Sequence, residues 1–306
     1  MRTTRTPHWI CPATIAAALY LAFGGWRDAA LAPASLQVAA PTASPPAGAI
    51  RLRPQGDTAN VRMELPGVDG CIDLRLPEVI NDDSRRIVYT EANLTGGIVW
   101  RISPEGAITG EWKRTGLAAY RIKASPQSDG VLLDWVITNL SRAPWNDAAG
   151  NICMRSDTVP VLFDPSGNQI FLRAERKWVS AADTGNVGST WYLPPGRKVA
   201  GIMQPYVQEG SYRISQFRPD EAIIAVRSHD CSWVLAQAWP ESRYLLANIQ
   251  PRYQCCEAPP YLGDILPGKT VRITGKLYFI RGTLDDLERN YRRDLKRGVI
   301  ARHAEK

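Results

Sequence analysis

Short runs of alternating apolar and polar residues recur from about residue 50 to residue 282, which is the pattern of half-buried β-strands. Turn sequences rich in Gly and Pro, such as Asp-Pro-Ser-Gly at 164–167, separate these runs. Many short strands at this spacing predict an all-β protein built as an antiparallel β-sandwich. The expected strands are 61–65, 72–76, 120–123, 131–137, 159–163, 222–226, 233–239 and 271–280.

One segment near the C-terminus has helical periodicity instead. Thr283 and Asp286 form a capping-box pair, and cations gather in the later turns, where they suit the helix dipole. This predicts a short C-terminal helix packed on an outer face of the sandwich, so that the folded domain covers 50–298. Residues 299–306 are expected to be a solvated tail. The apolar face of the helix comprises Leu284, Leu287, Tyr291 and Leu295.

The N-terminus has the features of a secretory signal. Arg2 and Arg5 precede a short apolar run at 15–23, and small residues suitable for cleavage follow near residue 34. We therefore expect residues 1–34 to be a signal peptide, and 35–49, rich in Ala and Pro, to be a linker. The alternative is an uncleaved N-terminal anchor. Cleavage would leave a secreted or periplasmic protein without a membrane span.

Composition limits the functions to consider. The chain has 306 residues and a formal charge of +7, and its 10 Trp and 11 Tyr exclude a disordered protein. Basic residues cluster only at 289–297, where acids balance them, so we expect no nucleic-acid partner. No Gly-rich phosphate loop, dinucleotide fingerprint or Gly-x-Ser-x-Gly elbow is present, and no cofactor is predicted.

Cysteine and histidine usage bears on disulfides and metals. Cys11 lies in the expected signal, and an oxidising compartment would allow disulfides among the other five, whose pairing stays open. An odd count leaves at least one thiol unpaired within the chain. No Cys-x-x-Cys spacing occurs, and only His229 and His303 remain after cleavage, so no metal site is predicted. The five remaining cysteines are Cys71, Cys153, Cys231, Cys255 and Cys256.

Acids beside tryptophans are the first candidates for chemistry. Glycoside hydrolysis needs two carboxyl groups about 5–10 Å apart, and sugar rings stack on Trp. Glu111 and Asp134 are expected on neighbouring strands and form the best candidate pair. The alternative is that these acids form cross-strand salt bridges and that the tryptophans fill the core. The candidate ligand-binding residues are Trp112, Trp135, Trp145, Arg173 and Trp191.

His229 is the second candidate. Its ordinary pKa suits a general acid or base, although adjacent residues of a strand face opposite sides, so that Asp230 would not orient it. The alternative is a turn residue between two strands. A polysaccharide lyase is a further possibility, in which Tyr or His removes a proton and an Arg such as Arg173 neutralises a uronate.

Two stretches carry a resemblance to a known group of proteins. One runs from Gly-Asp-Ile-Leu-Pro-Gly-Lys-Thr at 263–270 into the last strand and the helix, and the other is Trp-Val-Ile-Thr-Asn-Leu-Ser at 135–141 with Trp-Asn-Asp at 145–147. Together they resemble secreted proteins of the galactose-mutarotase-like supersandwich group. The resemblance implies a supersandwich-like fold and a role in handling sugars. It also implies a two-His acid/base pair, which the chain departs from because His229 is its one interior histidine.

Three functions are compatible with these observations. The first is an exported carbohydrate-associated protein that binds glycan in an aromatic-lined groove. The second is a sugar-active hydrolase or lyase that uses Glu111 and Asp134, or His229. The third is a structural envelope protein without a ligand. The sequence predicts neither the glycan nor the oligomeric state.

Overall fold

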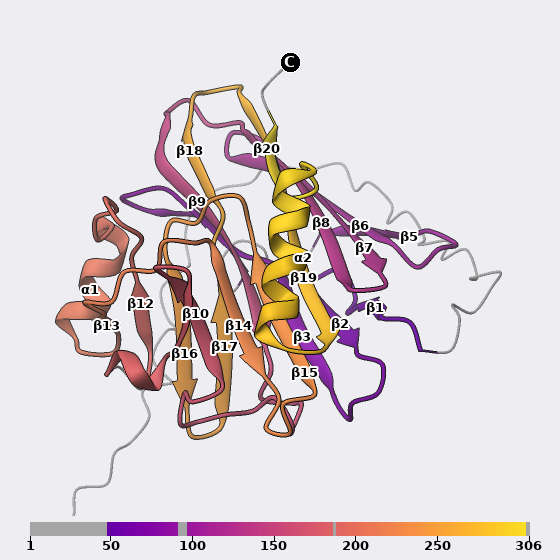
Figure 1. The fold of residues 1–306 in the computed structure, drawn as a ribbon. Coiled ribbons are helices and arrows are strands. Elements are labelled where there is room, and N and C mark those ends of the chain that lie inside the picture. Colours follow the sequence, from indigo (N-terminus) through magenta and orange to yellow (C-terminus); the bar gives the residue numbers. More distant parts are fainter. Residues whose placement is uncertain (1–47, 91–96, 186–187, 304–306) are drawn as a thin grey trace, which may run out of the picture. The chain divides into compact units, whose positions relative to one another are not determined.

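The computed structural model describes residues 48–90, 97–185 and 188–303, all of which belong to one compact unit (Figure 1). In these residues the strands form two sheets of ten strands each, and nearly all pairings are antiparallel. The all-β sandwich predicted from the alternating pattern is therefore confirmed. No helix in the described ranges is long and apolar enough to cross a membrane.

The first sheet carries the pocket described below. Its central strands are β3 (Cys71–Asn81), β9 (Trp145–Arg155), β17 (Tyr253–Glu257) and β16 (Leu245–Gln250), in that order. The outer strands are β1 (Arg51–Pro54) and β2 (Asn60–Glu64) beyond β3, β12 (Thr190–Tyr192) and β13 (Arg213–Ile214) beyond β16, β4 (Arg86–Tyr89) on β3, and β18 (Tyr261–Ile265) on β9.

The second sheet is built around β19 (Thr270–Arg281), which pairs with β8 (Gly130–Asn139) and β15 (Trp233–Ala238). Beyond β8 lie β7, β6 and β5, and beyond β15 lie β14, β10 and β11. These strands are β7 (Ala118–Gln127), β6 (Ile108–Arg114), β5 (Val99–Ile102), β14 (Ile223–Arg227), β10 (Ile170–Ala174) and β11 (Lys177–Ser180).

The main core fills the space between the two sheets. Trp135, Trp145 and Trp239 are its largest apolar side chains and are fully buried. Two glycines make room for these rings, since a Cβ on Gly150 would lie 2.3 Å from the Trp135 ring and one on Gly275 would lie 2.2 Å from the Trp239 ring. Close packing of this kind leaves no space for added methyl groups.

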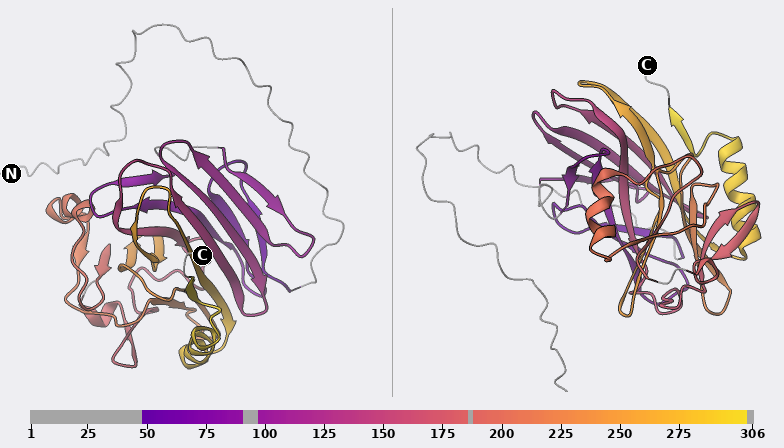
Figure 2. Two further views of the ribbon diagram at one scale, coloured as in Figure 1. Left: turned by 90° about the horizontal axis from the view of Figure 1, so that it is seen from above. Right: turned by 90° about the vertical axis from the view of Figure 1, so that its left-hand side faces the viewer.

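Helix α2 (Leu284–Lys296) confirms the expected C-terminal helix and begins at the predicted capping box of Thr283 and Asp286. Leu287 and Tyr291 pack on apolar side chains of β14, β15 and β19, on the outer face of the second sheet (Figure 1). A short helix, α1 (Gln204–Gln208), lies on the opposite side of the described fold (Figure 2). The short 3-10 helices η1 (Ala182–Thr184) and η2 (Gly201–Met203) complete the helical elements.

Two local expectations are wrong. Residues 159–163 form consecutive turns instead of a strand, with Leu162 N–H donating to the Val159 carbonyl, because Pro160 has no N–H to give to a sheet. The expected solvated tail includes a buried residue, Ile300, and a strand, β20 (Ala301–His303), that pairs with β19. The expected signal peptide and most of the linker lie outside the described residues.

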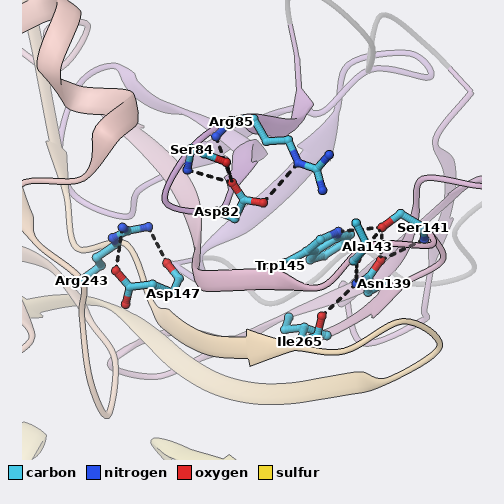
Figure 3. A network of polar contacts seen from close by, with 10 residues as sticks. All are labelled: Asp82, Ser84, Arg85, Asn139, Ser141, Ala143, Trp145, Asp147, Arg243 and Ile265. Atoms are coloured by element: carbon cyan, nitrogen blue, oxygen red, sulfur yellow. Dashed lines mark hydrogen bonds and ion pairs between the residues drawn. The ribbon is translucent and has the colours of Figure 1, made fainter.

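The second stretch behind the family resemblance has a clear structural role. Asn139, at the end of β8, donates to the carbonyls of Ala143 and Ile265 at 2.9 and 2.8 Å (Figure 3). Its Oδ1 accepts from the N–H and hydroxyl of Ser141, and Ser141 Oγ in turn accepts from Trp145 Nε1 at 3.3 Å. This network fixes the loop that leads the chain from the second sheet into β9 of the first.

Candidate functional site

A pocket of about 150 Å³ lies on the face of the first sheet that points away from the sandwich core. Alternation along β17 explains its position, because Cys256 packs in the core while Tyr253 and Glu257 face the other way. We call it the aromatic pocket. Its lining residues are Glu78, Val79, Asn81, Arg86, Tyr89, Asn151, Trp191, Ile202, Met203, Tyr206, Tyr212, Tyr244, Leu246, Asn248, Tyr253 and Glu257.

One wall of the aromatic pocket is a cluster of rings. Trp191 on β12 stacks on Tyr212, with ring centroids 4.5 Å apart, and meets the edges of Tyr206 and Tyr244 at 6.2 Å each. Tyr206 comes from α1 and Tyr212 from the segment before β13, so the chain between β12 and β14 covers this face of the sheet. Nε1 of Trp191 is buried and has no hydrogen-bond partner in the described part of the chain.

The floor of the pocket brings two carboxyl groups together. Asn151 Nδ2, on β9, donates to Glu78 Oε2 at 3.0 Å and also to Glu257 Oε2. Arg75 pairs with Glu78 at 2.8 Å. Burial raises the pKa of Glu257 to about 8, and the charge of Glu78 adds to the effect. Asn151 Oδ1 is buried and is left without a partner among the described residues.

Two thiols lie directly beside Glu257. Cys255 Sγ is 2.8 Å from Glu257 Oε1 and 2.7 Å from the Sγ of Cys153 on β9, and all three residues are buried. Burial raises the pKa of Cys255 well above its ordinary value. No disulfide forms among the cysteines of the described ranges, so the disulfide expected from the sequence stays a prediction.

Glu111 and Asp134 do not lie on neighbouring strands, as the sequence led us to expect. They are on β6 and β8, and β7 runs between these strands in the second sheet. Glu111 pairs with Arg101 at 2.6 Å, and Asp134 pairs with Arg272 through two bonds of 2.8 Å. The structure therefore places both acids in cross-strand ion pairs.

The candidate ligand-binding tryptophans divide into two groups. Trp112 is buried against Tyr120 at 5.7 Å, and Trp135 and Trp145 are fully buried in the core. These three side chains do not surround an open face. Trp191, in contrast, lines the aromatic pocket. Its proposed role as a ligand contact stays a prediction.

His229 and Arg173 lie outside the aromatic pocket. His229 is an exposed turn residue whose Nε2 is 2.8 Å from the Phe163 carbonyl, while Asp230 accepts from Ser228 instead. Arg173 is buried under α2, where it pairs with Glu288. Neither residue lies next to the Glu111 or Asp134 ion pairs in any contact described above.

Sequence reasoning missed Glu78, Asn151 and Glu257 as a group. The available signal was the alternation of Tyr253, Cys255 and Glu257, which places three chemically capable side chains on one face of a strand. Their partners are far away in sequence, since Asn151 is 73 residues from Glu78 and 106 from Glu257. Only the order of β3, β9 and β17 in the sheet brings them together.

The fold and site define an all-β sandwich protein with an aromatic, carboxyl-floored pocket on the outer face of one sheet. No family model matches the chain, and no curated protein matches it. Among solved structures, it is similar to a galactose mutarotase-like protein from Lactobacillus casei (TM-score 0.43, 8% identity, 76% of this chain and 100% of that one). It is also similar to a galactose mutarotase related enzyme from Lactobacillus acidophilus (TM-score 0.44, 8% identity, 76% and 98%). Both names fall in the group that the sequence resembles, and the likeness concerns the fold alone.

Proposed function

We propose that the protein binds a carbohydrate in the aromatic pocket. The observation that carries this proposal is the pairing of an aromatic wall with polar atoms that lack partners. Trp191 Nε1 on the wall and Asn151 Oδ1 on the floor are both buried and unpaired within the described ranges. Buried polar atoms normally find a partner, so two such atoms in one pocket indicate a ligand that supplies it.

A sugar fits this combination of surfaces. Its C–H face packs against rings such as Trp191 and Tyr212, and its hydroxyls can both donate and accept hydrogen bonds. Glu78, Asn151 and Asn248 provide acceptors and donors at the pocket floor and side. The pocket is smaller than the roughly 300 Å³ or more of a drug-sized site, so we propose that it holds one sugar unit.

We also propose that residues 1–34 direct export and that the protein acts in the periplasm or outside the cell. The basic start, the short apolar run and the small residues near position 34 support this proposal. The test is expression of the full chain in a bacterial host, followed by fractionation and N-terminal sequencing of the mature protein. A protein that keeps Met1 and stays in the cytoplasm would contradict it.

A thermal-shift screen tests sugar binding directly. The folded protein is screened against neutral hexoses, beginning with galactose, and against uronic acids and their oligosaccharides. A ligand at 100 times its Kd stabilises the native state by about 2.7 kcal/mol. Product analysis of each hit distinguishes binding from turnover, which also tests the hydrolase and lyase alternatives.

The screen needs a matched pair of variants. Trp191→Leu removes a ring from the wall of the pocket and should weaken binding at least tenfold, a loss of roughly 1.4 kcal/mol. Trp178→Leu is the control, because Trp178 is also a partly buried tryptophan with an unpaired Nε1 in the described chain but lies outside the pocket. No saturable shift with any sugar, or equal losses in the two variants, would refute the proposal.

A further inference from the structure

Three metal-binding side chains meet beneath the aromatic pocket. The Sγ atoms of Cys153 and Cys255 and a carboxyl oxygen of Glu257 lie within 4.8 Å of one another, and all three residues are buried. Cys255 and Glu257 are two residues apart on β17 and share a face. Cys255 pairs in register with Arg155 of β9, so Cys153, two residues before Arg155, stands on the same face of the adjacent strand.

We propose that Cys153, Cys255 and Glu257 bind one thiophilic divalent cation of the zinc class. Two thiolates and a carboxylate suit Zn²⁺, which takes Cys, His and Asp or Glu in tetrahedral sites. Three protein ligands leave a fourth position, and Glu257 lines the aromatic pocket, so this position faces the pocket. Metal binding here does not depend on sugar binding, and the two are measured separately.

The distances between the ligand atoms need only a modest change. Two Zn–S bonds of 2.3 Å at a tetrahedral angle separate the sulfurs by roughly 3.8 Å. The Sγ atoms of Cys153 and Cys255 are 2.7 Å apart, and Cys255 Sγ is 2.8 Å from Glu257 Oε1. Rotation about the Cα–Cβ bonds can open this group by the required ångström, because both thiols project from the same face of the sheet.

Neighbouring groups are placed to orient the ligands. Asn151 Nδ2 donates to Oε2 of Glu257, which leaves Oε1 turned toward Cys255. The hydroxyl of Tyr253 is 3.7 Å from Cys153 Sγ. Outer hydrogen bonds of this kind fix the direction of metal ligands. Within the described part of the chain, no Lys, Arg or His forms an ion pair with Glu257, so a cation would supply the positive charge that this buried carboxyl lacks.

The experiment uses the full chain, purified with a thiol reductant, stripped of metal with a chelator and titrated with Zn²⁺ and then Co²⁺. We expect one equivalent of each to bind. The Co²⁺ form should have thiolate-to-cobalt charge-transfer absorption in the near ultraviolet and the visible bands of a tetrahedral site. X-ray absorption of the Zn²⁺ form should give two sulfur neighbours at about 2.3 Å and lighter atoms at about 2.0–2.2 Å.

Substitutions assign the ligands. Cys153→Ser and Cys255→Ser should each lose the two-sulfur signature, and Asn151→Ala should weaken Zn²⁺ binding about 10- to 100-fold as an outer-shell change. Cys256→Ser is the matched control, since Cys256 is equally buried on β17 but packs in the sandwich core. Circular dichroism confirms that each variant is folded.

Several results would overturn the proposal. One is that the reduced wild-type protein binds neither Zn²⁺ nor Co²⁺ stoichiometrically. Another is a bound metal without sulfur neighbours, or with a signal that Cys256→Ser removes and Cys153→Ser leaves intact. A wild-type protein two mass units lighter than its reduced form, which takes up no metal after reduction, would instead identify Cys153 and Cys255 as a disulfide pair. The X-ray absorption measurement decides the matter even where a variant fails to fold.

Discussion

Trp191 and Tyr212 stack with their ring planes 16° apart and their centroids separated by 4.5 Å, and this pair forms the wall of the aromatic pocket. The two residues come from β12 and from the covering segment that contains α1, so their contact holds that segment on the sheet. The stability of the pocket and its shape therefore depend on the same pair of rings.

We expect the ring of Tyr212 to matter more than its hydroxyl. Tyr212→Ala removes the stacking and should lower the free energy of unfolding by about 2–4 kcal/mol, in the range for large-to-small changes. Tyr212→Phe keeps the ring and loses only the 3.2 Å contact from Asn248 Nδ2, so it should cost about 1 kcal/mol or less. Urea unfolding measures both. Equal losses would mean that the hydroxyl, and not the stacking, holds the segment.

The first pair of catalytic candidates makes a clear contrast with the pocket. Glu111→Gln and Asp134→Asn remove partners of partly exposed ion pairs with Arg101 and Arg272, in the second sheet. Such pairs contribute about 0–1 kcal/mol, and neither acid lines the aromatic pocket. We expect both variants to bind any sugar found in the screen with unchanged affinity. A loss of binding or of turnover in either variant would restore the original hypothesis.

Much of the fold follows from local pattern. Alternation predicts strands such as β8 and β19, and the capping box and apolar spacing predict α2, because each signal is contained in a few consecutive residues. The exception at 159–163 is instructive. Its apolar residues are buried as expected for Val159 and Leu162, but Pro160 turns the segment away from any sheet.

The site could not be found in the same way. Which strands become neighbours is not encoded in a local pattern, so the meeting of Glu78 and Glu257 across β9 is invisible in the sequence. Trp135 and Trp191 also cannot be told apart by residue type, since a tryptophan serves equally well as core or as pocket wall. Burial decides between them, and burial follows from the complete arrangement of the two sheets.

Acid should weaken the attachment of α2. Burial by itself raises the pKa of Asp294, but hydrogen bonds from Lys276, Tyr278 and Arg293 outweigh it and leave this pKa below its ordinary value. A lowered pKa in the folded state means that the stabilisation is present above the unfolded-state pKa and is lost as the pH falls through the folded-state pKa. Lys276 Nζ and Tyr278 OH both lie 2.9 Å from Asp294 Oδ2.

The variant Asp294→Asn tests this attachment. It leaves the buried Lys276 with Asp129 as its remaining acidic partner, so we expect a loss of about 3 kcal/mol at neutral pH. The difference from wild type should shrink as the pH is lowered, which urea unfolding at several pH values will measure. Asp285→Asn, an exposed change on the same helix, is the control and should alter stability little. A pH-independent difference would contradict a role for the ionised carboxylate.

The packing of Gly150 against Trp135 gives a prediction about the core. A Cβ at position 150 would lie 2.3 and 2.4 Å from two atoms of the Trp135 ring, which is fully buried and has no room to move. Gly150→Ala should therefore destabilise the protein by about 1–3 kcal/mol through overpacking. In a Trp135→Leu background the clash is absent, so the same substitution should cost much less. A double-mutant cycle by urea unfolding measures this coupling, and additive losses would show that Gly150 is required for its backbone conformation instead of for space.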